Sequence, residues 1–200
     1  MNRLRSALGL ALAVVVVVPL LSGCGRAQGS DSPQALAAPG EQASVRKYDA
    51  YIDGYNELID IIFGLKQAYS KYRELRIAQA DPHRDLYFNP ADTTVRHAIA
   101  ALRAGRTIAA GDTGAADRAT DALLPTLERI QRRYETLGPY YASKAYRHDR
   151  LARGRAEDAA LIADYETALR DIDQLGRVLD AYQRANRARA FASTQRTSER

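Results

Sequence analysis

The lone cysteine of this 200-residue chain, Cys24, is the side chain best placed for chemistry. A short positive segment at residues 3–5 is followed by an almost unbroken apolar run over residues 7–21. Ser22 and Gly23 then supply the small residues that a signal peptidase requires before its cleavage site. We expect cleavage directly before Cys24, which would place its thiol on the first residue of the mature chain.

The four residues Leu21-Ser22-Gly23-Cys24 resemble the lipobox of bacterial lipoproteins, whose cysteine thiol takes a diacylglyceryl group and whose new N-terminus is acylated. The resemblance implies a lasting membrane anchor, because each buried CH₂ group contributes about 0.8 kcal/mol. In Gram-negative lipoproteins an aspartate after the cysteine favours the inner membrane, so Gly25 implies the outer membrane, with the domain facing the periplasm. Two alternatives stay open, an ordinary secretory signal with an incidental cysteine and an uncleaved anchor helix.

The composition gives no reason to expect a nucleic-acid partner. Cleavage would leave about 177 residues with a net charge of about +3, enough for one domain with a sizeable core but too weakly basic for nucleic-acid binding. With Cys24 acylated, no thiol remains for a disulfide or for catalysis. The membrane, reached through Cys24, is therefore the first partner that we expect.

No catalytic or metal-binding pattern appears in the sequence. Di-iron sites of helical bundles need Glu-x-x-His pairs, which are absent, and the chain has three separate histidines, His83, His97 and His148. Ser70 and Ser143 lack a Gly-x-Ser-x-Gly elbow. We therefore expect no cofactor, no metal and no enzymatic activity. The remaining alternative is an enzyme whose residues meet only in the folded chain.

Tyrosines and arginines gather between residues 140 and 155, around an expected helix turn. The candidates for a binding surface are Tyr140, Tyr141, Tyr146, Arg150, Arg153 and Arg155. Aromatic faces and cations suit sugars and anionic groups, so this segment could bind an envelope polymer or a lipid phosphate. The alternative, which we favour, is a turn stabilised by tyrosine packing with its arginines in solvent.

Apolar residues that recur at steps of three and four predict four helices. The expected helices span residues 45–78, 94–110, 115–144 and 150–190. Ser44 is the expected cap of the first helix, and Ile59 and Ile172 should be buried because each lies centrally on a long apolar stripe. Pro125 and Pro139 should kink or divide the third helix.

The expected organisation follows from these segments. It consists of a signal peptide over residues 1–23, the lipidated Cys24 with a disordered tether over residues 24–43, a helical domain over residues 44–190 and a disordered tail over residues 191–200. No segment alternates with period two, so we expect an all-α fold. Long helices joined by short turns predict an antiparallel bundle of three long helices and one shorter helix.

Two segments carry a resemblance to a known family. Tyr51-Ile52-Asp53-Gly54-Tyr55-Asn56 is similar to a Tyr-Ile-x-x-Tyr-Asn motif. Residues 140–155 are similar to a segment with Tyr-Tyr, Lys-x-Tyr and Asp-Asp-x-x-Ala-Lys-Gly-Lys, except that His148 replaces the first aspartate and Arg153 and Arg155 replace lysines. Together they resemble the YiiG-like bacterial lipoproteins, helical domains of unknown function. The resemblance implies a helical lipoprotein without known catalytic residues, and we expect a lipid-anchored binding or scaffold domain for an envelope protein or polymer.

Overall fold

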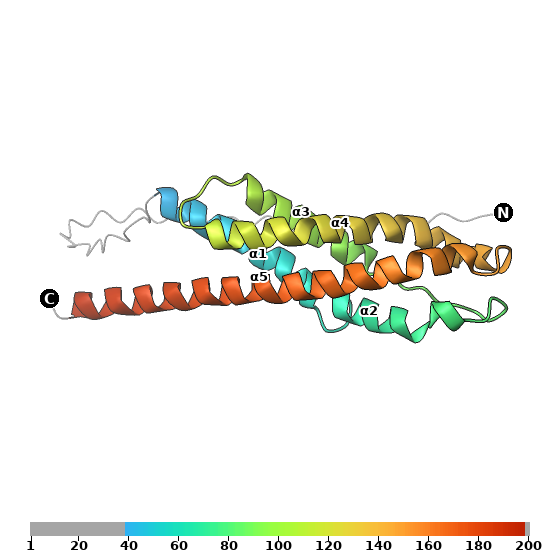
Figure 1. The fold of residues 1–200 in the computed structure, drawn as a ribbon. Helices are drawn as coiled ribbons and strands as arrows, with labels where there is room; N and C mark the ends of the chain where they lie inside the picture. Colours follow the sequence, from blue (N-terminus) through green and yellow to red (C-terminus); the bar gives the residue numbers. More distant parts are fainter. Residues whose placement is uncertain (1–38, 199–200) are drawn as a thin grey trace, which may run out of the picture. The chain divides into compact units, whose positions relative to one another are not determined.

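The computed structural model describes residues 39–198, and every regular element in this range is helical (Figure 1). The elements are α1 (Pro39–Ile59), α2 (Leu65–Glu74), the 3₁₀ turn η1 (Ile77–Gln79), α3 (Asp92–Thr107), α4 (Gly114–Ala142), the 3₁₀ turn η2 (Ala145–Arg147) and α5 (Ala152–Ser198). The prediction of a helical fold without strands is confirmed for this part of the chain. The predicted signal peptide, the anchor at Cys24 and most of the predicted tether lie outside the described residues.

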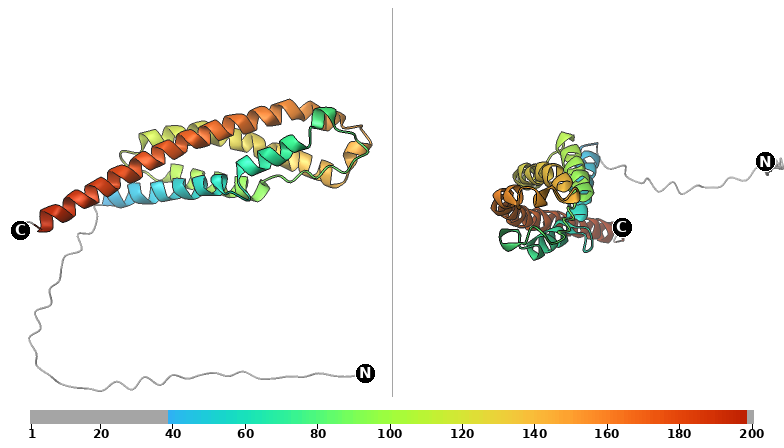
Figure 2. Two further views of the ribbon diagram at one scale, coloured as in Figure 1. Left: turned by 90° about the horizontal axis from the view of Figure 1, so that it is seen from below. Right: turned by 90° about the vertical axis from the view of Figure 1, so that its right-hand side faces the viewer.

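Long helices pair in opposite directions, as Figures 1 and 2 show for α1 with α3 and for α4 with α5. A Cβ atom at Gly105 of α3 would lie 2.5 Å from the ring of Tyr51 on α1, so these helices approach closely because this position has no side chain. Between α4 and α5, the buried hydroxyls of Tyr134 and Tyr165 are 2.7 Å apart. The buried hydrophobic residues all lie between positions 48 and 179 within the described range, so this domain contains its own core.

The first helix is shorter than predicted, because the chain leaves it in a short loop. The carboxylate of Asp60 accepts hydrogen bonds from the backbone N–H groups of Ile62 and Phe63, at 2.8 and 2.7 Å. Gly64 then precedes α2 in an extended conformation, and a Cβ atom there would lie 2.2 Å from the carbonyl oxygen of Asp60. Only glycine fits this turn. The prediction that Ile59 is buried is therefore wrong, since this residue is 46% exposed.

The start of α1 also differs from the prediction. The helix begins at Pro39, so residues 39–43 are helical rather than part of a disordered tether. Ser44 lies inside the helix and is not its cap. Its hydroxyl donates to the carbonyl oxygens of Gly40 and Gly111, each at 3.1 Å, and so connects α1 to the loop before α4.

The later helices follow the prediction except at the end of the chain. α4 is continuous through Pro125 and Pro139, so the two prolines do not divide it. The carboxylate of Asp149 accepts the backbone N–H of Arg153, in the first turn of α5, at 3.1 Å. α5 continues through residues 191–198, where a disordered tail was predicted. The alanines and arginines before and within this segment favour the helix.

A polar cluster joins α1 to the start of α4. Lys47 is only 3% exposed and forms an ion pair of 2.9 Å with Asp117, which also accepts hydrogen bonds from Tyr51 and Thr113. Burial raises the pKa of the Asp117 carboxyl, but the hydrogen bonds from Tyr51, Lys47 and Thr113 outweigh burial and hold this pKa below its ordinary value. Asp117 is therefore ionised at neutral pH, and Lys47 is buried as one half of an ion pair rather than as an isolated charge.

Candidate functional site

The three tyrosines of the 140–155 segment belong to the core. Tyr140, Tyr141 and Tyr146 are all buried, and their rings pack on one another with centroids 5.0 to 6.3 Å apart. The hydroxyl of Tyr146 donates to the carbonyl oxygen of Arg84 and accepts the backbone N–H of Leu86. Because these rings are covered by the surrounding chain, their faces are not open for stacking against a sugar.

The arginines of the same segment are exposed, and the side chains of Arg153 and Arg155 contact other parts of the domain. Arg155 donates to the carbonyl oxygens of Arg150 and Ala80, each at 3.0 Å. The guanidinium group of Arg153 lies over the ring of Tyr140, 5.8 Å from its centroid. The structure thus separates the predicted surface into buried tyrosines and exposed arginines, in an arrangement typical of a stabilised helix turn.

Changing Arg150, Arg153 and Arg155 together to glutamine should lower the free energy of unfolding by no more than about 1–2 kcal/mol, because exposed charged contacts contribute about 0–1 kcal/mol each. Retention on isolated peptidoglycan should not change. Thermal unfolding and a sedimentation assay measure the two quantities. Lost retention with unchanged stability would instead show that this turn binds an anionic polymer.

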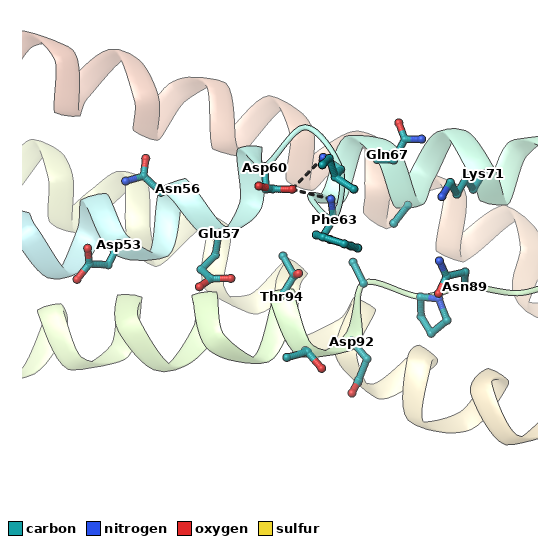
Figure 3. A pocket seen from close by; sticks show the side chains of 15 residues that line it. Asp53, Asn56, Glu57, Asp60, Phe63, Gln67, Lys71, Asn89, Asp92 and Thr94 are labelled. Atoms are coloured by element: carbon teal, nitrogen blue, oxygen red, sulfur yellow. Dashed lines mark hydrogen bonds between the residues drawn. The ribbon is translucent and has the colours of Figure 1, made fainter.

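A groove of about 910 Å³ lies between α1, α2 and the start of α3 (Figure 3). Four carboxylates line it, from Asp53, Glu57, Asp60 and Asp92, and Lys71 of α2 is the one basic residue among its lining residues. Figure 3 shows Asp53 and Glu57 along α1 and Lys71 farther along the groove on α2. The charge of the lining is negative overall, so the groove favours a cationic group.

An apolar loop, residues 60–63, forms one rim of this groove. Ile61, Ile62 and Phe63 are 86, 60 and 70% exposed. The backbone N–H groups of Phe63 and Ile62 hydrogen-bond Asp60 and lower the pKa of its carboxyl, so the carboxylate that shapes the loop is ionised at neutral pH. Adjacent apolar side chains that are exposed to solvent are typical of an interaction surface, because their exposure is unfavourable unless a partner covers them.

The apolar periodicity of the sequence did not predict this loop. Ile59 and Ile62 continue the three- and four-residue steps of α1, so the pattern predicted an uninterrupted helix. The sequence feature that could have predicted a turn here is Asp60 followed by Gly64. An aspartate side chain often accepts hydrogen bonds from the backbone N–H groups of the next residues, and glycine allows backbone atoms to approach closely.

Asp164 is a buried carboxylate, 8% exposed, that is paired within the domain. Asp164 on α5 is enclosed by Arg129 and Arg133 of α4, at 2.8 and 3.0 Å. Within residues 39–198, no group of three His, Cys, Asp or Glu side chains is placed to hold a metal ion. The same part of the chain contains no helix long and apolar enough to cross a membrane.

The three histidines, for which no metal site was predicted, lie in different elements of the structure. His83 lies in the loop before α3, His97 lies on α3, and His148 lies in the turn after η2. His97 approaches a carboxylate of the groove, with its Nδ1 4.0 Å from Glu57.

The described residues define a helical domain with an open, acidic groove and an apolar rim. Residues 42–200 match the model of a family described as a protein of unknown function, DUF3829. The chain belongs to this family. No curated protein and no solved structure matches the chain. The family match includes α2 to α5 and most of α1, so the groove, the apolar loop and the 140–155 turn all lie in the family domain.

Proposed function

We propose that this chain is a lipid-anchored, non-enzymatic binding domain of the bacterial envelope, built as an antiparallel helical bundle. Its binding site is the groove with the apolar loop. The observation that carries the proposal is the exposure of Ile61, Ile62 and Phe63 beside a negatively charged groove. Such a contiguous apolar patch is typical of a surface that a partner covers.

The anchor is supported by the sequence before the domain. Cys24 follows an apolar run and two small residues, in the order that lipoprotein processing requires. The resemblance to YiiG-like lipoproteins is consistent with this anchor. Gly25 favours the outer membrane, with the domain facing the periplasm.

Changing Cys24 to serine should abolish labelling of the protein by a fatty-acid analogue and release a soluble or unprocessed form. The reason is that the serine hydroxyl cannot form the thioether on which lipidation depends. Metabolic labelling followed by membrane fractionation measures both effects. Undiminished labelling of Cys24→Ser would contradict the anchor, and recovery of the wild type in the inner membrane alone would contradict the outer-membrane location.

The chemistry of the groove indicates the class of partner. Asp53 has no cationic side chain within 4 Å among the described residues, and Glu57 has only His97 at 4.0 Å. The adjacent loop offers apolar side chains. We therefore infer a protein segment that presents lysine or arginine next to apolar residues, because it would satisfy both surfaces at once. Photo-crosslinking from position 63 in cells tests this binding site.

The alternative, an anionic envelope polymer bound by residues 140–155, has weaker support. It requires open aromatic faces, and Tyr140, Tyr141 and Tyr146 are buried. The exposed arginines give a positive surface, and Arg150, Arg153 and Arg155 do not line the groove.

A further inference from the structure

The last part of α5 reaches the beginning of α1 and continues past it. The ring of Tyr182 stacks on Tyr48 of α1, with centroids 3.3 Å apart. Farther along, Arg189 lines the same surface hollow as Gly40 and Glu41 at the start of α1. Residues after 190 therefore extend beyond α1, as both views of α5 show (Figures 1 and 2). We refer to residues 181–198 as the α5 end.

The α5 end is basic. It contains four arginines, and no aspartate or glutamate occurs between Asp180 and Glu199. Arg184, Arg187 and Phe191 are spaced at i, i+3 and i+7, so they share one face of the helix. All three side chains are exposed, and Phe191 is 67% exposed.

The arginines on this face are available to an external anion. Arg187 donates to Gln183 at 3.4 Å. In the described part of the chain, no carboxylate lies within 4 Å of the guanidinium group of Arg184 or Arg187, and the acid on the same face is Asp180, one turn earlier. Arg189 differs, because it faces the hollow that Glu41 and Asp112 also line.

The position of the α5 end indicates which anion it meets. Only fourteen residues lie between Cys24 and Pro39, so an anchored chain keeps the start of α1 within about 50 Å of the lipid even when fully extended. The α5 end lies beside the start of α1. An acylated Cys24 therefore holds this basic face, with its exposed Phe191, at high effective concentration near the membrane surface.

We propose that the α5 end binds the anionic phospholipid headgroups of the membrane that carries the anchor, through Arg184, Arg187 and Phe191. A helix with cations and an aromatic residue on one face has the chemistry of an interfacial membrane contact. This inference rests on the proposed lipid anchor, since only an anchored chain keeps the α5 end near lipid.

The contact would leave the groove free. The apolar loop lies at the opposite end of the 21-residue α1 from Pro39, about 30 Å away along the helix axis. Binding of the α5 end to headgroups therefore uses a surface that is separate from the groove, and both surfaces can be occupied at once.

The test uses residues 24–200 with Cys24→Ser, which contains the complete core and carries no acyl chain. Its sedimentation is measured with vesicles of phosphatidylcholine alone and of phosphatidylcholine with phosphatidylglycerol. We expect binding only to the anionic vesicles, and weakening with added salt. The variant Arg184→Gln with Arg187→Gln should bind roughly twentyfold more weakly, because each cation near an anionic surface contributes about fivefold.

The matched control is Arg150→Gln with Arg153→Gln, which removes the same charge just before and at the start of α5 and should bind like the parent protein. Equal losses in both variants, equal binding to the two kinds of vesicle, or no binding to either kind would overturn the proposal. If the double variant fails to fold, the single variant Arg187→Gln gives the same comparison, with an expected loss of about fivefold. Because this protein is not acylated, the result is independent of whether Cys24 is lipidated in cells.

Discussion

Replacing Asp117 by alanine should lower the free energy of unfolding by about 3 kcal/mol, because it leaves the buried ammonium group of Lys47 without its partner. The expected loss lies at the low end for a broken buried pair, since the Asp117 side chain is 22% exposed. The hydroxyl of Tyr51 loses the same acceptor. Chemical denaturation of the wild type and the variant measures the difference.

The matched control is Asp121→Ala, one turn farther along α4. Asp121 is 52% exposed and pairs with Arg106 at 2.6 Å, so its loss should cost about 0–1 kcal/mol. Equal losses for the two variants would contradict the assignment of Asp117 as the partner on which burial of Lys47 depends.

The contribution of Asp117 should also depend on pH. Its pKa is lower in the folded protein than in the unfolded chain, so its stabilisation is complete above the unfolded value of about 3.9 and is lost as the pH falls through the folded value. The stability difference between wild type and Asp117→Ala should therefore shrink below about pH 4. A difference that grew under acid would contradict the direction of this pKa shift.

Replacing Ile172 by alanine should lower the free energy of unfolding by about 2–5 kcal/mol, because Ile172 is 3% exposed and its truncation leaves a cavity in the core. The same substitution at Ile59 should change stability by less than about 0.5 kcal/mol, as expected for a surface position. The two variants remove identical atoms, so the comparison isolates burial. A cost at Ile59 that matched the cost at Ile172 would show that residue 59 packs in the core.

Helix periodicity was sufficient to identify the secondary-structure class and most helix positions. The stripe through Ile172 identified a buried face correctly, because side chains three and four residues apart lie on the same side of a helix. The same rule failed at Ile59 and in the following loop. There, hydrogen bonds from the backbone to Asp60 and the close approach at Gly64 replace the helix, and an apolar pattern does not report either contact.

The candidate site was harder to predict from the sequence than the helices were. The 140–155 segment attracted attention because tyrosines and arginines alternate there, but sequence spacing does not separate a buried ring from an exposed one. Tyr146 is enclosed because the loop before α3, some sixty residues earlier, supplies its hydrogen-bond partners. The groove likewise combines carboxylates from α1 and α3 that meet only after folding. Chemistry assembled from distant segments has no local sequence signature.

The proposed binding site accounts for exposed apolar and acidic side chains that take no part in packing of the core. Phe63 is 70% exposed although it lies in a loop that Asp60 holds in place, so its exposure is part of the folded conformation. Asp53 and Glu57 line the adjoining wall. A partner that covers the loop would bury apolar surface and pair with these carboxylates. The apolar contact would supply affinity, and the carboxylates would select a positively charged partner.

Photo-crosslinking in living cells tests this central claim most directly. A photoreactive phenylalanine analogue replaces Phe63 in the full-length chain, and a second protein carries it at Ala160, an exposed position on α5 outside the groove. A third protein combines the analogue at position 63 with Asp53→Lys and Glu57→Lys. Adducts are resolved by electrophoresis, and mass spectrometry identifies the crosslinked segment.

We expect a discrete adduct from position 63 that is absent from position 160 and strongly reduced by the two charge reversals. The crosslinked segment should present lysine or arginine next to apolar residues. Adducts of equal yield from both positions, an adduct indifferent to Asp53→Lys and Glu57→Lys, or no adduct from position 63 would contradict the assignment of the groove and the apolar loop as the binding site.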